Sequence, residues 1–313
     1  MNSRIGFIDI GTNTILCLIA ELKSDGGFDV IDDLAEITRL GQGVDRARQI
    51  SQEGEQRSLQ VLRHYLERCR RLNVEEIIAV GTSALRDAQN SAEVRARIKQ
   101  QLGVEVRVIS GDEEAAYAFL AVQKGLALAD DELLVVDVGG GSTEFIRGNA
   151  VGISQAVSAN IGTVRLTEQF LHSDPVRKEE YEKMIIVIER ELTRLPHKWL
   201  KDGSALSLVG IAGTFTTLSA VEKKLLRYAH AEVHGSCLTL SEVRRQAALF
   251  QAKTIEERKA IPGLEPGRAD VMLAGAILVE RIMTAFHFEQ VIVSDQGVRY
   301  GLLHECLKQR NSC

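Results

Sequence analysis

Two segments of the sequence combine an aspartate, glycines and hydroxyl side chains in the same order. They read Asp9-Ile10-Gly11-Thr12-Asn13-Thr14 and Asp137-Val138-Gly139-Gly140-Gly141-Ser142-Thr143-Glu144. Glycine lets the backbone approach a ligand closely, so that successive N–H groups can surround an anionic oxygen. An aspartate beside such a loop is suited to hold Mg²⁺ next to phosphates. The pattern predicts phosphate chemistry, and its recurrence makes two ordinary hairpin turns the weaker interpretation.

Each of these segments lies between two apolar, strand-like runs and therefore predicts a strand, a tight turn and a returning strand. After each hairpin, helical and strand-like patterns alternate. The predicted helices lie at 51–72, 91–102, 112–124, 176–194, 269–286 and from 298 onward, and the predicted strands at 75–80, 104–109, 133–158, 206–211 and 289–294. This order predicts an α/β protein with two domains that face a cleft.

The length of 313 residues also favours two domains. We place an N-terminal domain at residues 1–125 and a C-terminal domain at 126–313, with a hinge at 126–131 and a last helix that can pack back on the first domain. The chain is 45% hydrophobic and 26% charged with a net charge of −5, which argues against a general nucleic-acid binder. Five scattered cysteines and the lack of a long apolar run predict a cytoplasmic protein without a membrane anchor.

Two further segments carry candidate catalytic side chains. Arg86 lies one turn into a predicted helix, where its guanidinium can grip a phosphate through two hydrogen bonds, although surface pairing is the commoner role. Three carboxylates open the predicted helix at 112–124. We expect Asp112 to cap it, and acidic residues such as Asp112 and Glu113 at a helix start to serve its cap and dipole. Glu114 lies deeper in the first turn and is a candidate base that activates water.

Three other segments give weaker signals. Gly213 and Thr214 follow a predicted strand and begin a helix, whose amino end can take a phosphate or part of a nucleotide. His230 and His234 have a spacing found in metal sites, but without a further acidic partner we favour satisfied or solvent-facing histidines. Asp295 follows the last predicted strand, either in another turn that faces the cleft or as a helix cap.

Together these motifs resemble the exopolyphosphatase and guanosine pentaphosphate phosphohydrolase family of the actin, sugar kinase and heat-shock-70 superfamily, whose domains have a ribonuclease H-like fold. The matching segments occur in the family's order across nearly the whole chain. They are Asp9–Asn13, Gly81–Arg86, Ile109–Ala115, Asp137–Glu144, Gly210–Thr214 and Ser294–Arg299. The pattern Ile-Ser-Gly-x-Glu-Glu-Ala together with Asp-x-Gly-Gly-Gly-Ser-Thr-Glu is specific to this branch of the superfamily.

The resemblance implies Mg²⁺-assisted hydrolysis of a terminal phosphoanhydride, with another divalent cation as an alternative to Mg²⁺. The substrate is inorganic polyphosphate, guanosine pentaphosphate or both. Glu114 would activate the attacking water and Arg86 would neutralise charge on the transferred phosphoryl group. The remaining implied roles are metal binding by Asp137, Glu144 and Asp9, and phosphate binding by Gly11, Thr12, Asn13, Gly139, Gly140, Gly141, Ser142, Gly213 and Thr214.

Several alternatives stay open from the sequence. An actin-like or chaperone-type switch would use the same hairpins to bind ATP, and a small-molecule kinase would need a catalytic aspartate that no segment marks. Longer relatives carry additional helical domains, so we expect shorter polyphosphate chains or the guanosine nucleotide as substrates, and a homodimer stays open. Arg165, Arg268 and Lys124 could extend an anionic track, although isolated basic side chains are more often solvated.

Overall fold

The computed structural model describes residues 3–126, 128, 132–196 and 206–311. The chain forms two compact units: unit 1 contains Met1–Ala121 and Gly297–Cys313, and unit 2 contains Val122–Gln296. The boundary expected at 125/126 lies four residues after the first of these divisions, and the last helix belongs to unit 1. Most of the predicted hinge, residues 127 and 129–131, lies outside the described residues. No helix in the described ranges is long and apolar enough to span a membrane.

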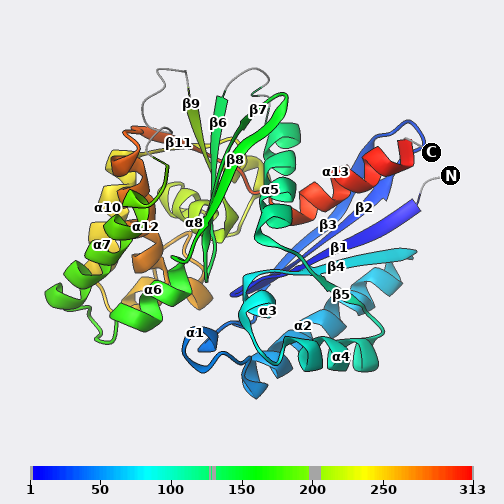
Figure 1. Cartoon of the computed structure of the whole chain (residues 1–313), viewed down its shortest axis with the longest axis horizontal. Coiled ribbons are helices and arrows are strands. Elements are labelled where there is room, and N and C mark those ends of the chain that lie inside the picture. The colour runs from blue at the N-terminus through cyan, green and yellow to red at the C-terminus, as the bar shows by residue number, and fades with distance from the viewer. Residues whose placement is uncertain (1–2, 127, 129–131, 197–205, 312–313) are drawn as a thin grey trace. The chain divides into compact units, whose positions relative to one another are not determined.

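Unit 1 is built on a five-stranded mixed sheet, sheet A, in the order β3-β2-β1-β4-β5 (Figure 1). Strands β1 and β2 form the first predicted hairpin, and β4 and β5 extend the sheet parallel to β1. Its strands are β1 (Ser3–Ile10), β2 (Thr14–Leu22), β3 (Phe28–Ile37), β4 (Glu76–Gly81) and β5 (Val106–Val108). Because β1, β4 and β5 are parallel, the loops that follow them gather at one edge of the sheet.

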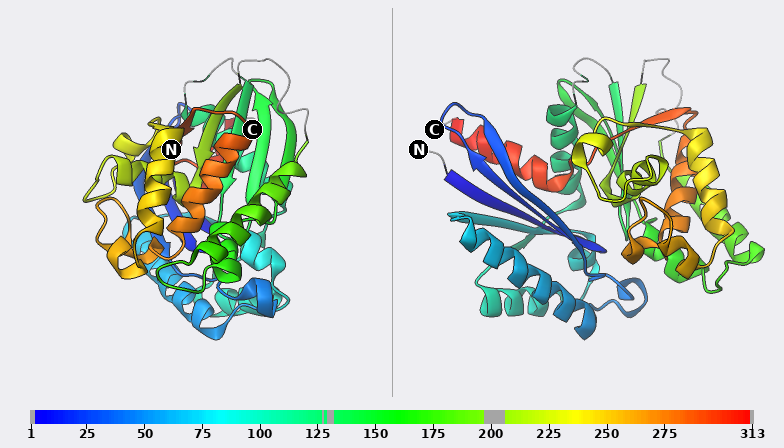
Figure 2. Two further views of the ribbon diagram at one scale, coloured as in Figure 1. Left: turned by 90° about the vertical axis from the view of Figure 1, so that its left-hand side faces the viewer. Right: turned by 180° about the vertical axis from the view of Figure 1, so that it is seen from behind.

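Helices cover both faces of sheet A, as the right-hand view in Figure 2 shows. On one face, α2 and α4 bury a cluster that includes Leu62, Tyr65 and Ile98. On the other face, α5 and α13 bury a second cluster that includes Phe7, Leu18 and Leu303. The helices of this unit are α1 (Val44–Ala47), α2 (Gln52–Arg71), α3 (Ser83–Asp87), α4 (Ser91–Leu102), α5 (Gly111–Gly125, which ends in unit 2) and α13 (Val298–Asn311).

Unit 2 repeats this scheme on a six-stranded sheet, sheet B, in the order β10-β11-β9-β6-β7-β8. Strands β6, β7 and β8 are antiparallel neighbours, whereas β9 and β11 run parallel to β6. Its strands are β6 (Glu132–Val138), β7 (Thr143–Asn149), β8 (Gly152–Ala159), β9 (Leu206–Ile211), β10 (Cys237–Thr239) and β11 (Gln290–Val293). The two mixed sheets with their covering helices confirm the α/β fold class.

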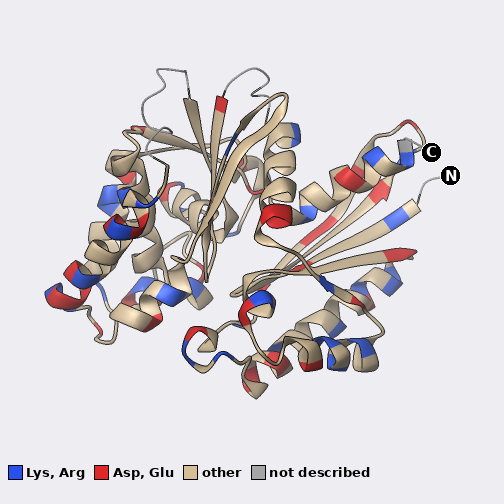
Figure 3. Ribbon diagram, viewed as in Figure 1, with Lys and Arg blue, Asp and Glu red and all other residues tan. Residues whose placement is uncertain are grey.

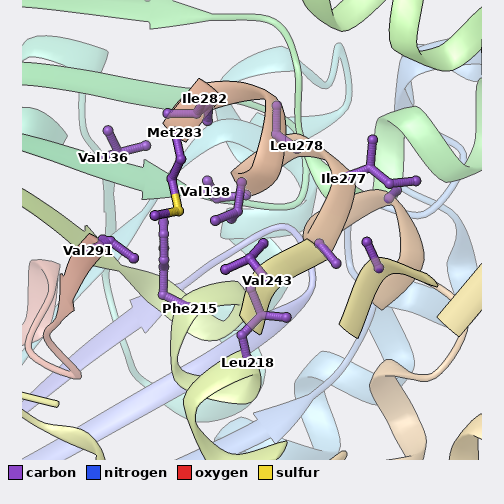
Figure 4. Close-up of a cluster of buried hydrophobic side chains, with 14 of the residues drawn as sticks. Val136, Val138, Phe215, Leu218, Val243, Ile277, Leu278, Ile282, Met283 and Val291 are labelled. Atoms are coloured by element: carbon purple, nitrogen blue, oxygen red, sulfur yellow. The ribbon is translucent and has the colours of Figure 1, made fainter. Parts of the chain in front are cut away.

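The core of unit 2 lies between sheet B and its helices. Figure 4 shows α12 residues such as Met283 packed toward Val136 of β6 and Phe215 of α8. Charged residues of this unit lie mostly on outer helices such as α7 and α10, while few lie on its strands (Figure 3). The helices are α6 (Thr163–Phe170), α7 (Lys178–Thr193), α8 (Ala212–Glu222), α9 (His230–Val233), α10 (Leu240–Gln251), α11 (Ile255–Lys259), the 3₁₀ turn η2 (Pro266–Arg268) and α12 (Met272–Ala285).

Most predicted elements are present, and the differences have local causes. Helix α4 ends at the predicted Gly103, which adopts a left-handed conformation with φ of 72°. The cap predicted for Asp112 is wrong: the Ser110 hydroxyl accepts a hydrogen bond from the Glu113 amide at 3.1 Å, and the Glu113 carboxylate accepts one from the Ser110 amide at 2.9 Å. Helix α10 was not predicted, although Thr239 caps it through the Glu242 amide.

Candidate active site

The two glycine hairpins have the same backbone geometry. The Gly11 amide donates to the Thr14 carbonyl at 3.1 Å, and the Gly139 amide donates to the Ser142 carbonyl at 3.0 Å. A Cβ atom at Gly11 would lie only 2.8 Å from the Thr14 oxygen, so this tight turn requires glycine. The repeated Asp-x-Gly pattern therefore encodes one turn, formed once in each unit.

Carbonyl groups of both turns point into the protein. The Gly41 amide donates to Thr12 O at 2.8 Å, and the α6 amides of Thr163 and Val164 donate to Gly139 O and Gly140 O at 3.0 and 2.9 Å. Because C=O and N–H of a trans peptide point in opposite directions, the amides that follow these carbonyls point away from those partners. This orientation is what a phosphate-binding loop needs.

The second glycine loop is held by the start of α6. Two residues there, Gly162 and Arg165, contact the loop, although the sequence did not mark them as its partners. The Arg165 side chain donates from Nε to Gly141 O at 2.8 Å, so this arginine belongs to the loop and is not an isolated solvated cation. A Cβ atom at Gly162 would lie 2.4 Å from Gly140 O, so the close approach of α6 requires glycine there. Neither contact is visible from sequence spacing, because more than twenty residues separate the partners.

Asp137 and Glu144 face each other across the second hairpin. They are directly opposite in the antiparallel register of β6 and β7, and both are buried. The Ser158 hydroxyl donates to Glu144 Oε1 at 2.8 Å. Two like charges opposite each other in a sheet repel each other, and a divalent cation bound between them offsets this repulsion. In the first hairpin Leu16 stands opposite Asp9, so only the second copy pairs two carboxylates.

Asp9 ends β1 as a buried carboxylate in unit 1. Its pKa is raised to about 7, chiefly by burial and also by the nearby charge of Glu114, while the charge of Arg299 opposes the shift. Its Oδ1 atom is buried and has no hydrogen-bond partner among the described residues. An orphaned carboxylate oxygen of this kind fits a proton or a cation.

The metal-binding candidates are thus divided: Asp9 belongs to unit 1, whereas Asp137 and Glu144 belong to unit 2. Within the described ranges, no group of three or more His, Cys, Asp and Glu side chains is placed to hold a metal ion. Mg²⁺ at phosphate sites is usually held by one or two carboxylates together with substrate oxygens and water. The donor set of unit 2, two buried carboxylates, fits that requirement.

Arg86 and Glu114 form a pair at the edge of sheet A. Arg86 Nη1 donates to Glu114 Oε2 at 2.9 Å and to the Ile109 carbonyl at 3.1 Å. Helix α3 positions the arginine and the first turn of α5 positions the glutamate. Burial raises the pKa of Glu114, and the bond from Arg86 opposes this shift. A buried carboxylate with a raised pKa and a polar partner is typical of a general base.

The turn after β9 brings Gly213 and Thr214 to the hairpin of unit 2. The Thr214 hydroxyl donates to the Val138 carbonyl at 3.1 Å, which ties the start of α8 to β6. A Cβ atom at Gly213 would lie 2.2 Å from Arg268 Nη1, so the glycine admits this guanidinium to the amino end of α8. Arg268 is therefore another basic residue beside a candidate phosphate loop.

Arg299 of α13 is a residue whose role the motif alone did not reveal. Its guanidinium makes a two-bond pair with the Asp33 carboxylate, at 2.8 Å from Nε and 3.0 Å from Nη2, and the Tyr300 hydroxyl donates to the same carboxylate at 3.0 Å. All three side chains lie in unit 1. The charge of Arg299 lowers the pKa of Asp9, so the last helix influences the buried carboxylate at the end of β1.

Comparison with known proteins gives this arrangement a family context. The model of the Ppx/GppA phosphatase family matches residues 18–310. The bifunctional 3-dehydroquinate synthase/phosphatase of Fusobacterium nucleatum is 34% identical over 97% of the chain, which spans only 46% of that relative. Exopolyphosphatase 2 of Mycobacterium tuberculosis is 33% identical, with 96% of this chain and 97% of the relative covered.

Solved structures give the same result. A Ppx/GppA family member from Aquifex aeolicus is 34% identical with a TM-score of 0.82, and the match covers 99% of both chains. An exopolyphosphatase from Cytophaga hutchinsonii is 31% identical with a TM-score of 0.90, and the match covers 98% of both chains. These likenesses confirm the predicted actin-like fold.

Proposed function

Because the chain belongs to the Ppx/GppA phosphatase family, we propose that it hydrolyses terminal phosphoanhydrides of inorganic polyphosphate, guanosine pentaphosphate or both. The observation that carries this proposal is the pair of Arg86 with the buried Glu114, a carboxylate whose pKa is raised by burial. The name of the Mycobacterium tuberculosis relative, an exopolyphosphatase, supports polyphosphate as one substrate.

In the proposed reaction, Glu114 accepts a proton from water as the water oxygen bonds to the terminal phosphorus. The bond between that phosphorus and the bridging oxygen breaks, and the bridging oxygen leaves with the shortened chain. Orthophosphate is the other product. Glu114 suits the role because a base with a pKa nearer the working pH is more effective than an ordinary carboxylate. Arg86 would offset negative charge on the transferred phosphoryl group.

The loops contribute positioning. The amides after Thr12 and after Gly139–Gly141 would donate to nonbridging phosphate oxygens, since their carbonyls are held by the protein. Asp137 and Glu144 would hold a divalent cation, with Asp9 as a further candidate ligand from unit 1. Such an ion would offset charge on the phosphates when bound. Phosphoryl transfer depends mainly on this kind of positioning and electrostatic stabilisation.

The test compares the unmodified protein with Glu114→Gln and a matched control, Glu113→Gln. Orthophosphate release is measured with Mg²⁺ and short polyphosphate, long polyphosphate, guanosine pentaphosphate or ATP. We expect Glu114→Gln to lose about 10²- to 10⁴-fold in kcat, the range for a general base, with substrate binding retained. Glu113→Gln should stay near the unmodified rate, because Glu113 pairs with Arg107 on the surface.

The relative rates decide the substrate. Faster release from polyphosphate or from guanosine pentaphosphate identifies the preferred compound. If ATP alone binds, and no release depends on Glu114, the protein acts as a nucleotide switch and the hydrolase assignment is wrong.

A further inference from the structure

Two histidines of unit 2 converge on one buried carboxylate. His230 and His234 frame the short helix α9, and Asp295 follows β11 by two residues. Asp295 Oδ1 lies 3.1 Å from His234 Nδ1, and Asp295 Oδ2 pairs with His230 Nδ1. The Tyr228 hydroxyl lies 3.5 Å from the same Oδ2 atom. The two candidate segments that the proposed function left unused, around His230 and around Asp295, therefore form one cluster.

Both ring nitrogens of His234 face acceptors. Nδ1 faces the Asp295 carboxylate at 3.1 Å, with the Ser294 hydroxyl farther away at 3.4 Å, and Nε2 lies 3.1 Å from the carbonyl oxygen of Gly125. A carbonyl oxygen can only accept, and an ionised carboxylate can only accept, so satisfying both requires a proton on each nitrogen. The hydrogen bond to Asp295 raises the pKa of His234, and the Gly125 carbonyl adds to the shift, while burial opposes it. The geometry therefore favours a cationic His234.

The two partners of His234 lie close in sequence to the two places where the chain passes between the units. The first passage falls between Ala121 and Val122, inside α5, and Gly125 is the last residue of that helix. The second passage falls between Gln296 and Gly297, directly after Asp295. Gly125 and Asp295 both belong to unit 2, as does His234, so the contacts between them lie within one unit.

Helix α5 also carries Glu114 in its first turn, eleven residues before Gly125. At a rise of about 1.5 Å per residue, the two positions are about 16 Å apart along one helix. Glu114 itself is held in unit 1 by Arg86, so the tie at Gly125 acts on the direction in which α5 enters unit 2. Misplacement of a reacting group by about 1 Å can cost about 100-fold in rate.

We propose that His234, held by Asp295, is a positioning residue that fastens the carboxyl end of α5 to the segment after β11. The imidazolium of His234 bridges the two passages of the chain and fixes the anchored end of the helix that carries Glu114. The expected effect on turnover rests on the proposed function, whereas the anchor itself does not.

The anchor depends on pH in a defined direction. Neutral His234 has one N–H group and can keep only one of its two bonds, and the carboxylate is the stronger acceptor. The bond to Gly125 is therefore present below the raised pKa of His234 and is lost as the pH rises through it. The other titratable groups around His234 are Asp295, His230 and Tyr228, and Arg268 interacts with the Tyr228 hydroxyl. Burial opposes ionisation of Asp295, but its bonds to the two histidines lower its pKa.

The kinetic test measures kcat and KM for short polyphosphate between about pH 6 and pH 9 for the unmodified protein, His234→Gln, Asp295→Asn and His230→Gln. For the unmodified protein we expect kcat to fall on the alkaline side as His234 deprotonates. His234→Gln should lower kcat roughly tenfold at neutral pH, leave KM within about twofold and lack the alkaline fall.

The other two variants separate anchoring from general damage. Asp295→Asn removes the carboxylate that raises the pKa of His234, so the alkaline fall should move to lower pH. His230→Gln removes a bond to the same carboxylate but leaves the tie to Gly125, so the fall should persist. A fall that is unchanged in both His234→Gln and Asp295→Asn would overturn the proposal, even if both proteins lose thermal stability.

Hydrogen–deuterium exchange provides a readout that needs no catalysis. Amides of residues 122–126 and 294–298 should exchange faster in His234→Gln than in His230→Gln at the same neutral pH, because only the first loses the anchor. Equal protection in the two variants would refute the anchor. If the unmodified protein hydrolyses none of the substrates but the exchange difference is present, the proposed function fails and the anchor stands.

Discussion

Replacing Asp9 with asparagine is expected to stabilise the metal-free protein while it removes a candidate metal ligand. The pKa of Asp9 is raised from 3.8 to about 7, chiefly by burial and also by the charge of Glu114, so the folded protein holds this group as a carboxylic acid more tightly than the unfolded chain does. Ionisation therefore destabilises the folded state. The penalty is absent below the unfolded pKa, grows as the pH rises from about 4 to about 7, and is constant above the folded pKa.

The size of the effect follows from the two pKa values. Each unit of pKa difference corresponds to about 1.4 kcal/mol, so at pH 8 the charged Asp9 costs about 4 kcal/mol of unfolding free energy. At pH 5 only part of the penalty has developed, roughly 2 kcal/mol. The advantage of Asp9→Asn over the unmodified protein should therefore grow by about 2 to 3 kcal/mol between pH 5 and pH 8. Any effect of the amide that does not depend on pH is the same at pH 5 and at pH 8, so it does not contribute to this change.

The assay is urea unfolding of both proteins at pH 5 and pH 8 in the presence of a chelator, followed by the same series with Mg²⁺. If the orphaned Oδ1 atom of Asp9 contributes to a cation site, Mg²⁺ should stabilise the unmodified protein more than the variant at pH 8. The reasoning is refuted if the stability difference between the two proteins is the same at pH 5 and pH 8.

Three further outcomes are expected. The kcat of the unmodified protein should fall as the pH decreases through the raised pKa of Glu114, because Glu114 must be ionised to act as a base. A pH–rate profile with an ordinary carboxylate pKa near 4 would contradict this role. Glu144→Gln should relieve repulsion from Asp137 and stabilise the metal-free protein by about 0.2–1 kcal/mol, while calorimetry should show weaker Mg²⁺ binding; unchanged binding would remove Glu144 from the site. Gly162→Ala should lower the free energy of unfolding by about 1–3 kcal/mol and raise KM, because the new Cβ would collide with Gly140 O. A fully active, equally stable variant would show that the approach of α6 to the loop does not require glycine.

The sequence predicted the local parts of the protein well because their causes are local. The hairpin turn at Gly11–Asn13 depends on glycine and on apolar strands on either side, all within about twenty residues. Helix α4 was predicted with its bounds at Ser91–Leu102, since Gly103 supplies the left-handed termination. The cap of α5 was misassigned to Asp112, because the side chains of Ser110 and Glu113 accept hydrogen bonds from each other's amides.

The sequence by itself determined which chemical groups the chain carries and that its phosphate-loop turn occurs twice. Tertiary structure decided which of these groups meet. Arg86 and Glu114 are 28 residues apart, and His234 and Gly125 are 109 residues apart. The first contact depends on the parallel neighbours β4 and β5, which bring the segments that follow them to one edge of sheet A, and the second depends on α9 lying beside the end of α5. Burial, which raises the pKa of Asp9 and of Glu114, likewise depends on the packed neighbours and not on adjacent residues.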